Sequence, residues 1–92
     1  MEKQEEYFTE AEAQAKVRMR VKTIAKIEGI PLGTRGTVVR TEYLFTKKGY
    51  CVIVRWNLKL PPGQKKKGSV SYQEDWFTKT MYDELLTEEV KL

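Results

Sequence analysis

The run YCVIVRWNL, residues 50–58, constrains the fold more than any other stretch of the chain. The side chains at its alternate positions are all apolar or aromatic: Tyr50, Val52, Val54, Trp56 and Leu58. Because successive side chains of a β-strand point to opposite faces, this spacing predicts a strand with one face in the core. The other face starts apolar and turns polar at Arg55. The chain is therefore expected to be built on a β-sheet.

Shorter segments on either side of this run also have strand character. VRMRVK (17–22) alternates apolar and basic residues, and TVVRTEYLF (37–45) is rich in β-branched and aromatic residues. A glycine-bearing loop at 26–35 separates these two segments. After a basic hairpin tip at 64–68, VSYQ (70–73) predicts a fourth strand.

The C-terminal segments are less regular. EDWFTK (74–79) predicts a tight turn or a single helical turn. TMYDELLTEEV (80–90) fits either a closing strand or a short helix, and we expect a strand to about Leu85. Four or five short strands in roughly 70 residues predict a mainly β fold, a small five-stranded antiparallel barrel over residues 17–92. Closure removes exposed sheet edges.

Residues 1–16 have a different composition, rich in Glu, Gln and Ala. Thr9 and Glu12 have the spacing of a helical capping box. Phe8, Ala11 and Ala15 form a single narrow apolar stripe. These features predict a short N-terminal helix or a flexible tail, and not a second domain.

Composition excludes several classes of protein. The chain has 92 residues, enough for one small domain, and no stretch approaches the ~20 apolar residues of a membrane helix. It has no histidine and a single cysteine, Cys51. The usual general base, the commonest metal ligand and an internal disulfide are thus missing. We expect a cytoplasmic monomer that is not an enzyme and binds no metal or cofactor.

Charge is distributed unevenly along the sequence. Residues 17–79 contain fourteen Lys/Arg and four Asp/Glu, whereas 1–16 and 80–92 each carry a formal charge of −3. A basic middle attracts anionic partners such as an acidic protein or a nucleic acid. Alternatively, the acidic ends fold back and neutralise the middle. Both interpretations stay open at this point.

The stretch IPLGTRGTVVR (30–40) contains two glycines three residues apart. GTRG has the letters of a KH-type phosphate clamp, but that loop joins two helices and this one enters a strand. The Gly-Lys-Ser/Thr ending of a Walker loop is missing. We predict a corner in which Gly33, Gly36 or both adopt backbone angles that other residues disfavour.

The strand-like VRMRV, then GTRGTVVR, YCVIVRW and the ending YDELLTEEV look like SH3-like barrels. The similarity covers roughly residues 17–90 and is greatest to the photosystem I subunit IV family, with a looser likeness to the variable chain of ferredoxin–thioredoxin reductase. This resemblance implies a docking subunit of a photosynthetic or redox complex, with a cationic face for an acidic protein. The acidic N-terminal segment and the lysine tip depart from that family. LGTRGTV also resembles a KOW element, which implies RNA, ribosome or polymerase binding.

We predict that partner binding involves basic residues and one tryptophan: Arg18, Arg20, Lys22, Arg35, Arg40, Arg55, Lys65, Lys66, Lys67 and Trp76. The first three alternate along one strand and repel one another unless an anion is near. A solvated basic face and a solubilising lysine loop are the simpler alternatives. The first functional hypothesis is a docking module for an acidic protein or larger complex. The second is a KOW-like nucleic-acid module, and the third is a structural domain without a ligand.

Overall fold

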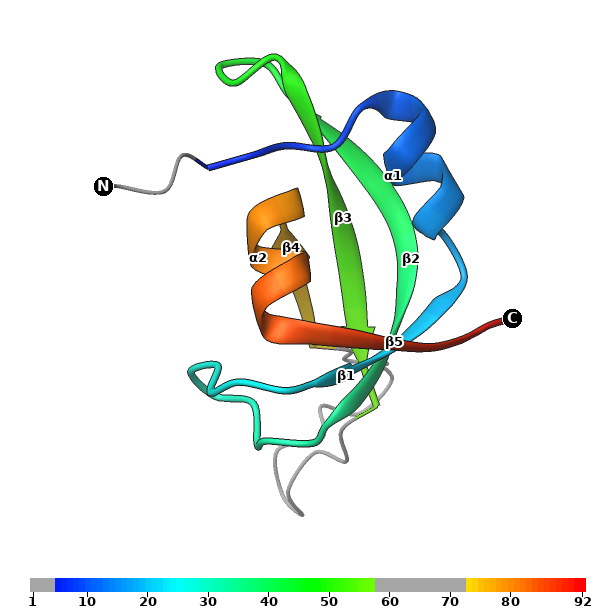
Figure 1. Ribbon diagram of the computed structural model, residues 1–92, viewed down its shortest axis with the longest axis vertical. Helices are drawn as coiled ribbons and strands as arrows, with labels where there is room; N and C mark the ends of the chain where they lie inside the picture. Colours follow the sequence, from blue (N-terminus) through cyan, green and yellow to red (C-terminus); the bar gives the residue numbers. More distant parts are fainter. Residues whose placement is uncertain (1–4, 58–72) are drawn as a thin grey trace, which may run out of the picture.

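The computed structural model describes residues 5–57 and 73–92. Its elements follow in chain order: α1 (Glu10–Lys16), β1 (Met19–Thr23), β2 (Arg35–Leu44), β3 (Gly49–Trp56), β4 (Glu74–Phe77), α2 (Lys79–Leu85) and β5 (Leu86–Lys91). The five strands form one antiparallel sheet in the order β4-β3-β2-β1-β5. Figure 1 shows β2 and β3 as two long strands side by side, with β1 and β5 crossing near their lower end.

The expected mainly β fold with five antiparallel strands is confirmed. Closure of the sheet into a barrel is not shown, because β4 and β5 are the two edges and do not pair with each other in the described residues. No helix in the described parts of the chain is long and apolar enough to cross a membrane.

The core lies on one face of the sheet and is covered by both helical segments. The strands contribute buried residues at alternate positions: Val21, Val38, Val52, Val54, Trp56 and Phe77. Phe8, before α1, and Tyr82, in α2, meet over this face with ring centroids 5.7 Å apart. The predicted core face of the strand at 50–58 is confirmed as far as Trp56, and Leu58 is outside the described residues.

The N-terminal segment packs on the sheet. Phe8 pairs with Tyr50 through two backbone hydrogen bonds of 2.9 Å. The predicted capping box at the start of α1 is present, with Thr9 and Glu12 bonded reciprocally. The predicted apolar stripe is only partly right, because Phe8 and Ala13 are buried while Ala11 and Ala15 are exposed. The register of α1 is set by docking onto β2 and β3.

Two C-terminal predictions are wrong. Residues 74–77 form β4 and not a turn, because the strand brings Phe77 into the core. Residues 79–85 form α2, the short helix given as the alternative, and not the favoured strand, because the Thr78 side chain caps the helix and a helical turn buries Tyr82. The extended segment begins only at Leu86. Of the strand expected at 70–73, residues 70–72 are outside the described residues, and Gln73 precedes β4.

The predicted corner before β2 is present, and its two glycines have different roles. Gly33 has a φ of +85°, a value that side-chain-bearing residues disfavour. Gly36 is needed for space, because a Cβ there would lie 2.7 Å from Val54 Cγ1. The strand predicted at 17–22 starts at Met19, because Arg18 has a φ of +78° and ends the connection from α1.

Candidate functional site

The strands expose side chains on the face opposite the core, which we call the outer sheet face. Its members are Arg20, Lys22, Arg35, Thr37, Val39, Arg40, Glu42, Cys51, Ile53, Arg55, Glu74 and Trp76. They are assigned by alternation with the core residues and by direct cross-strand pairing, which places paired side chains on the same face. This face brings together six of the ten predicted binding residues: Arg20, Lys22, Arg35, Arg40, Arg55 and Trp76.

One row of this face crosses four strands. Arg20 pairs with Thr37, Thr37 with Arg55, and Arg55 with Glu74. Two guanidinium groups thus flank a central hydroxyl. The row lies beside a hollow of about 330 Å³, whose lining includes Arg20, Thr37, Arg55 and Asn57.

The next row contains the exposed tryptophan. Arg40 pairs with Ile53, and Ile53 with Trp76. Ile53 is only 5% exposed although it lies on the outer sheet face, whereas Trp76 is 54% exposed. Direct cross-strand side chains are about 5 Å apart at Cβ, so the indole and the arginine stem flank the isoleucine. The row therefore combines an apolar floor, a broad aromatic ring and a cation.

A β-bulge between Val38 and Arg40 creates this arrangement. Without it, Arg40 would share the core face with Val38, because residues two apart in a strand point the same way. The extra residue at Val39 shifts the register, and Arg40 pairs with Ile53 on the outside. Arg40 and Arg55 therefore lie on adjacent strands, and the bulge makes both face outward.

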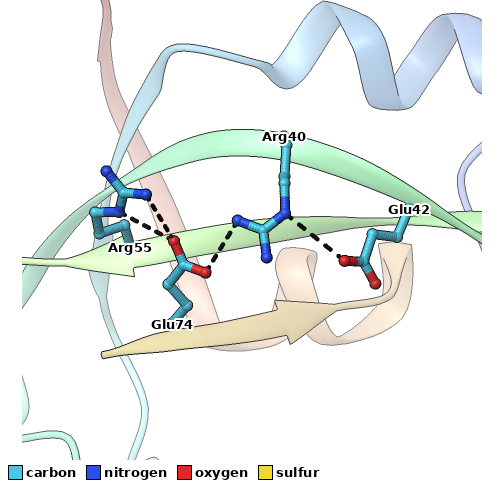
Figure 2. Close-up of polar contacts among 4 residues, drawn as sticks. All are labelled: Arg40, Glu42, Arg55 and Glu74. Carbon is cyan, nitrogen blue, oxygen red and sulfur yellow. Dashed lines mark hydrogen bonds and ion pairs between the residues drawn. The ribbon is translucent and has the colours of Figure 1, made fainter. Parts of the chain in front are cut away.

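Glu74 ties the two rows together (Figure 2). Its Oε1 lies 2.9 Å from Arg40 Nη1, and its Oε2 lies 3.0 Å from Arg55 Nη2. Arg55 Nε also donates to Oε2 at 3.0 Å, and Glu42 Oε1 lies 3.7 Å from Arg40 Nε. The hydrogen bonds from Arg40 and Arg55 hold the pKa of Glu74 below its usual value. The two arginines are thus oriented and partly neutralised by carboxylates.

Cys51 lies beside this network, but its thiol has low reactivity. It is 1% exposed, and burial, with a smaller contribution from Glu42, raises the pKa of its thiol. A thiol with a raised pKa stays protonated at neutral pH and is a poor nucleophile.

Arg18 and Arg35 lie outside the two rows described above. Arg18 precedes β1 and uses its backbone to bond Val38 and Leu92. Arg35 lies at the start of β2, where its Nε is 3.0 Å from Glu89 Oε1. The predicted lysine tip, Lys65–Lys67, is outside the described residues.

The acidic ends neutralise part of the basic middle. Lys79 Nζ is 2.9 Å from Glu12 Oε2 in α1, and β5 supplies the carboxylate for Arg35. Within residues 5–57 and 73–92, no ion pair involves Arg20 or Lys22. Residues in these two ranges carry twelve Lys/Arg and twelve Asp/Glu. Within these two ranges, attraction for an anionic partner therefore depends on the local arrangement of charge, since the formal net charge of +4 comes from the rest of the sequence.

Sequence patterns did not predict six members of the outer sheet face as binding residues, among them Thr37, Ile53 and Glu74. Ile53 is part of an apolar run that by itself indicates only a strand, and the turn predicted at 74–79 gives Glu74 no place on a sheet. The dipeptide Val38-Val39 followed by an arginine was the one available signal of a bulge, since it breaks the alternation.

Comparison of this chain with family models, curated proteins and solved structures finds no match to any of them. Its class is that of a small mainly β domain with one five-stranded antiparallel sheet and two short helices.

Proposed function

We propose that the chain is a non-enzymatic docking module with an SH3-like barrel fold, which binds an acidic protein through its outer sheet face. The fold part of this proposal is supported by the pairing of β1 with both β2 and the C-terminal β5, which brings the two ends of the domain together. It is also supported by the sequence resemblance to SH3-like barrels.

The observation that carries the binding proposal is the exposed indole of Trp76 in one row with Ile53 and Arg40. Tryptophan and arginine are the side chains most enriched at the energetic centres of protein interfaces. An indole that is half exposed on a sheet, over a buried isoleucine, gains apolar burial when a partner covers it. The row therefore has the composition of an interface centre.

Charge on the outer sheet face favours an acidic partner. The face carries five basic residues, Arg20, Lys22, Arg35, Arg40 and Arg55, against Glu42, Glu74 and the carboxylate of Glu89 that pairs with Arg35. This local excess steers an acidic surface toward the face and increases the association rate at low salt. The fixed carboxylates favour a partner with a defined charge pattern over a uniform polyanion.

Affinity capture with matched variants tests this function. We would immobilise the wild-type chain, Trp76→Ala and Phe45→Ala, and compare the proteins that each captures from a lysate of the native organism at low and high salt. Phe45 is a suitable control because it is an aromatic residue 84% exposed at the β2–β3 turn. The proposal expects an acidic protein that is lost with Trp76→Ala and with salt but retained with Phe45→Ala. Equal capture by wild type and Trp76→Ala would contradict it.

Binding of single-stranded RNA is a second candidate, favoured by the same exposed indole beside an arginine. Bases stack on exposed aromatic rings, and arginines contact phosphates. This candidate predicts salt-sensitive quenching of Trp76 fluorescence by single-stranded RNA, while Trp56, only 2% exposed, stays constant. No quenching at low salt would dismiss it.

A further inference from the structure

The geometry points to a carboxylate-binding subsite in the hollow beside Arg20, Thr37 and Arg55, which receives one Glu or Asp side chain of the partner. This inference rests on the proposed docking function and specifies the chemistry that the partner must present. None of the three residues belongs to the row that contains Trp76, so the subsite is a second contact on the same face.

The donor-bearing residues line the same hollow. Arg20 and Arg55 lie on β1 and β3, roughly 10 Å apart across β2, since neighbouring strands are about 4.8 Å apart. Thr37 lies between them and directs its side chain to the same face. Asn57, directly after β3, adds its side chain to the lining. A carboxylate above Thr37 is within reach of two guanidinium groups, a hydroxyl and an amide.

The two arginines contribute differently. Arg55 is held in place by Glu74, which accepts from its Nε and contacts its Nη2, both at 3.0 Å. Arg20 is exposed and has no ion pair with any residue of 5–57 or 73–92. A partner carboxylate would therefore give Arg20 the counter-charge that the described part of the chain does not supply. Charge-assisted bonds of this kind are about twice as strong as neutral ones.

Local charge selects a singly charged ligand. Arg20, Arg55 and Glu74 together carry a formal charge of +1, which one carboxylate balances. A phosphate dianion would leave a surplus negative charge next to Glu74, and like charges at short range are unfavourable. The volume of about 330 Å³ is near the lower end of small-ligand sites, which span about 300–1,000 Å³. Val39 adds an apolar wall for the methylene stem of the incoming side chain.

The test is an NMR titration of the full, ¹⁵N-labelled chain at constant ionic strength. The probe is the tripeptide acetyl-Gly-Glu-Gly-amide, with acetyl-Gly-Gln-Gly-amide as the neutral match and inorganic phosphate as a third arm. We expect the Glu peptide to shift the amide of Thr37, Nε of Arg20 and the side-chain amide of Asn57. The Gln peptide should not shift them, and phosphate should bind more weakly than the Glu peptide.

Two variants and one control sharpen the result. Arg20→Gln and Thr37→Val should each weaken binding of the Glu peptide, Arg20→Gln by about tenfold or more, because a bond to a charged group is lost. Lys47→Gln, which removes an exposed cation in the β2–β3 turn, should leave binding unchanged. Equal shifts with both peptides, tighter binding of phosphate, or an unchanged Arg20→Gln variant would overturn the inference.

Different experimental results would refute the subsite and the docking function. If the Glu peptide does not bind but Trp76→Ala abolishes capture, the subsite is wrong and the docking function stands. If the Glu peptide binds as expected but capture is independent of Trp76, the docking function is wrong and the subsite stands.

Discussion

Replacing Gly36 by alanine should destabilise the fold by crowding the core. The added Cβ would lie 2.7 Å from Val54 Cγ1, 2.9 Å from Trp56 Cε3 and 3.0 Å from the carbonyl oxygen of Arg55. Val54 and Trp56 are fully or almost fully buried, so they have no room to move aside. Overpacking of this kind costs about 1–3 kcal/mol, and three close contacts favour the upper half of that range. At about 4–8 °C per kcal/mol, Tm should fall by about 8–24 °C.

The neighbouring glycine supplies the control. Gly33 has a φ of +85° but open space, since the nearest atom to an added Cβ is Lys22 Cε at 3.8 Å. Gly33→Ala should therefore lower the free energy of unfolding only by the strain of a positive φ on alanine, about 1–2 kcal/mol. Gly33→Asn should cost less, because asparagine tolerates a positive φ, whereas Gly36→Asn should be at least as damaging as Gly36→Ala.

Urea and thermal unfolding of the four variants measure these differences. A Gly36→Ala variant within about 0.5 kcal/mol of wild type, the usual range for a harmless surface substitution, would refute the packing of β2 against β3 described above. A Gly33→Asn variant as unstable as Gly33→Ala would show that the corner needs glycine for a reason other than φ.

Three further variants test other contacts. Thr23→Val should lower the free energy of unfolding by about 1–3 kcal/mol more than Thr23→Ser, because the buried hydroxyl accepts from two backbone N–H groups of the loop before β2; equal values in urea unfolding would contradict this. Asp75→Ala should be less stable than Asp75→Asn and should shift the indole N–H resonance of Trp56, whose Nε1 donates to Asp75 Oδ2 at 2.6 Å. The pKa of Glu12 is lowered to about 2, first by the backbone N–H of Thr9 and next by Lys79. The carboxylate therefore stabilises the fold above pH 4.5 and loses this effect as the pH falls toward 2, so Glu12→Gln should reduce the loss of stability over that interval.

The main strand was predictable from sequence because its core face follows strict alternation through Val52, Val54 and Trp56. The helix cap at Thr9 was also predictable, since both partners of the capping box lie within four residues of each other. In both cases the signal is local, and the tertiary structure does not override it.

The missed elements depend on contacts between distant segments. β4 was hidden because Asp75 faces inward, where its carboxylate accepts the indole N–H of Trp56 on another strand. α2 was missed because TMYDELL suits a strand or a helix, and only the packing of Tyr82 against Phe8 decides between them. Arg40 was predicted as a binding residue, but the bulge at Val39 that turns it to the outer sheet face was not predicted from the sequence.

The most direct test of the docking account is the indole N–H resonances of the two tryptophans when the captured acidic partner is added. Trp76 is exposed on the outer sheet face, on the edge strand β4, and Trp56 is buried and bonded to Asp75. The account predicts that complex formation shifts the Trp76 resonance and leaves the Trp56 resonance in place. An unchanged Trp76 resonance in a fully formed complex would contradict it.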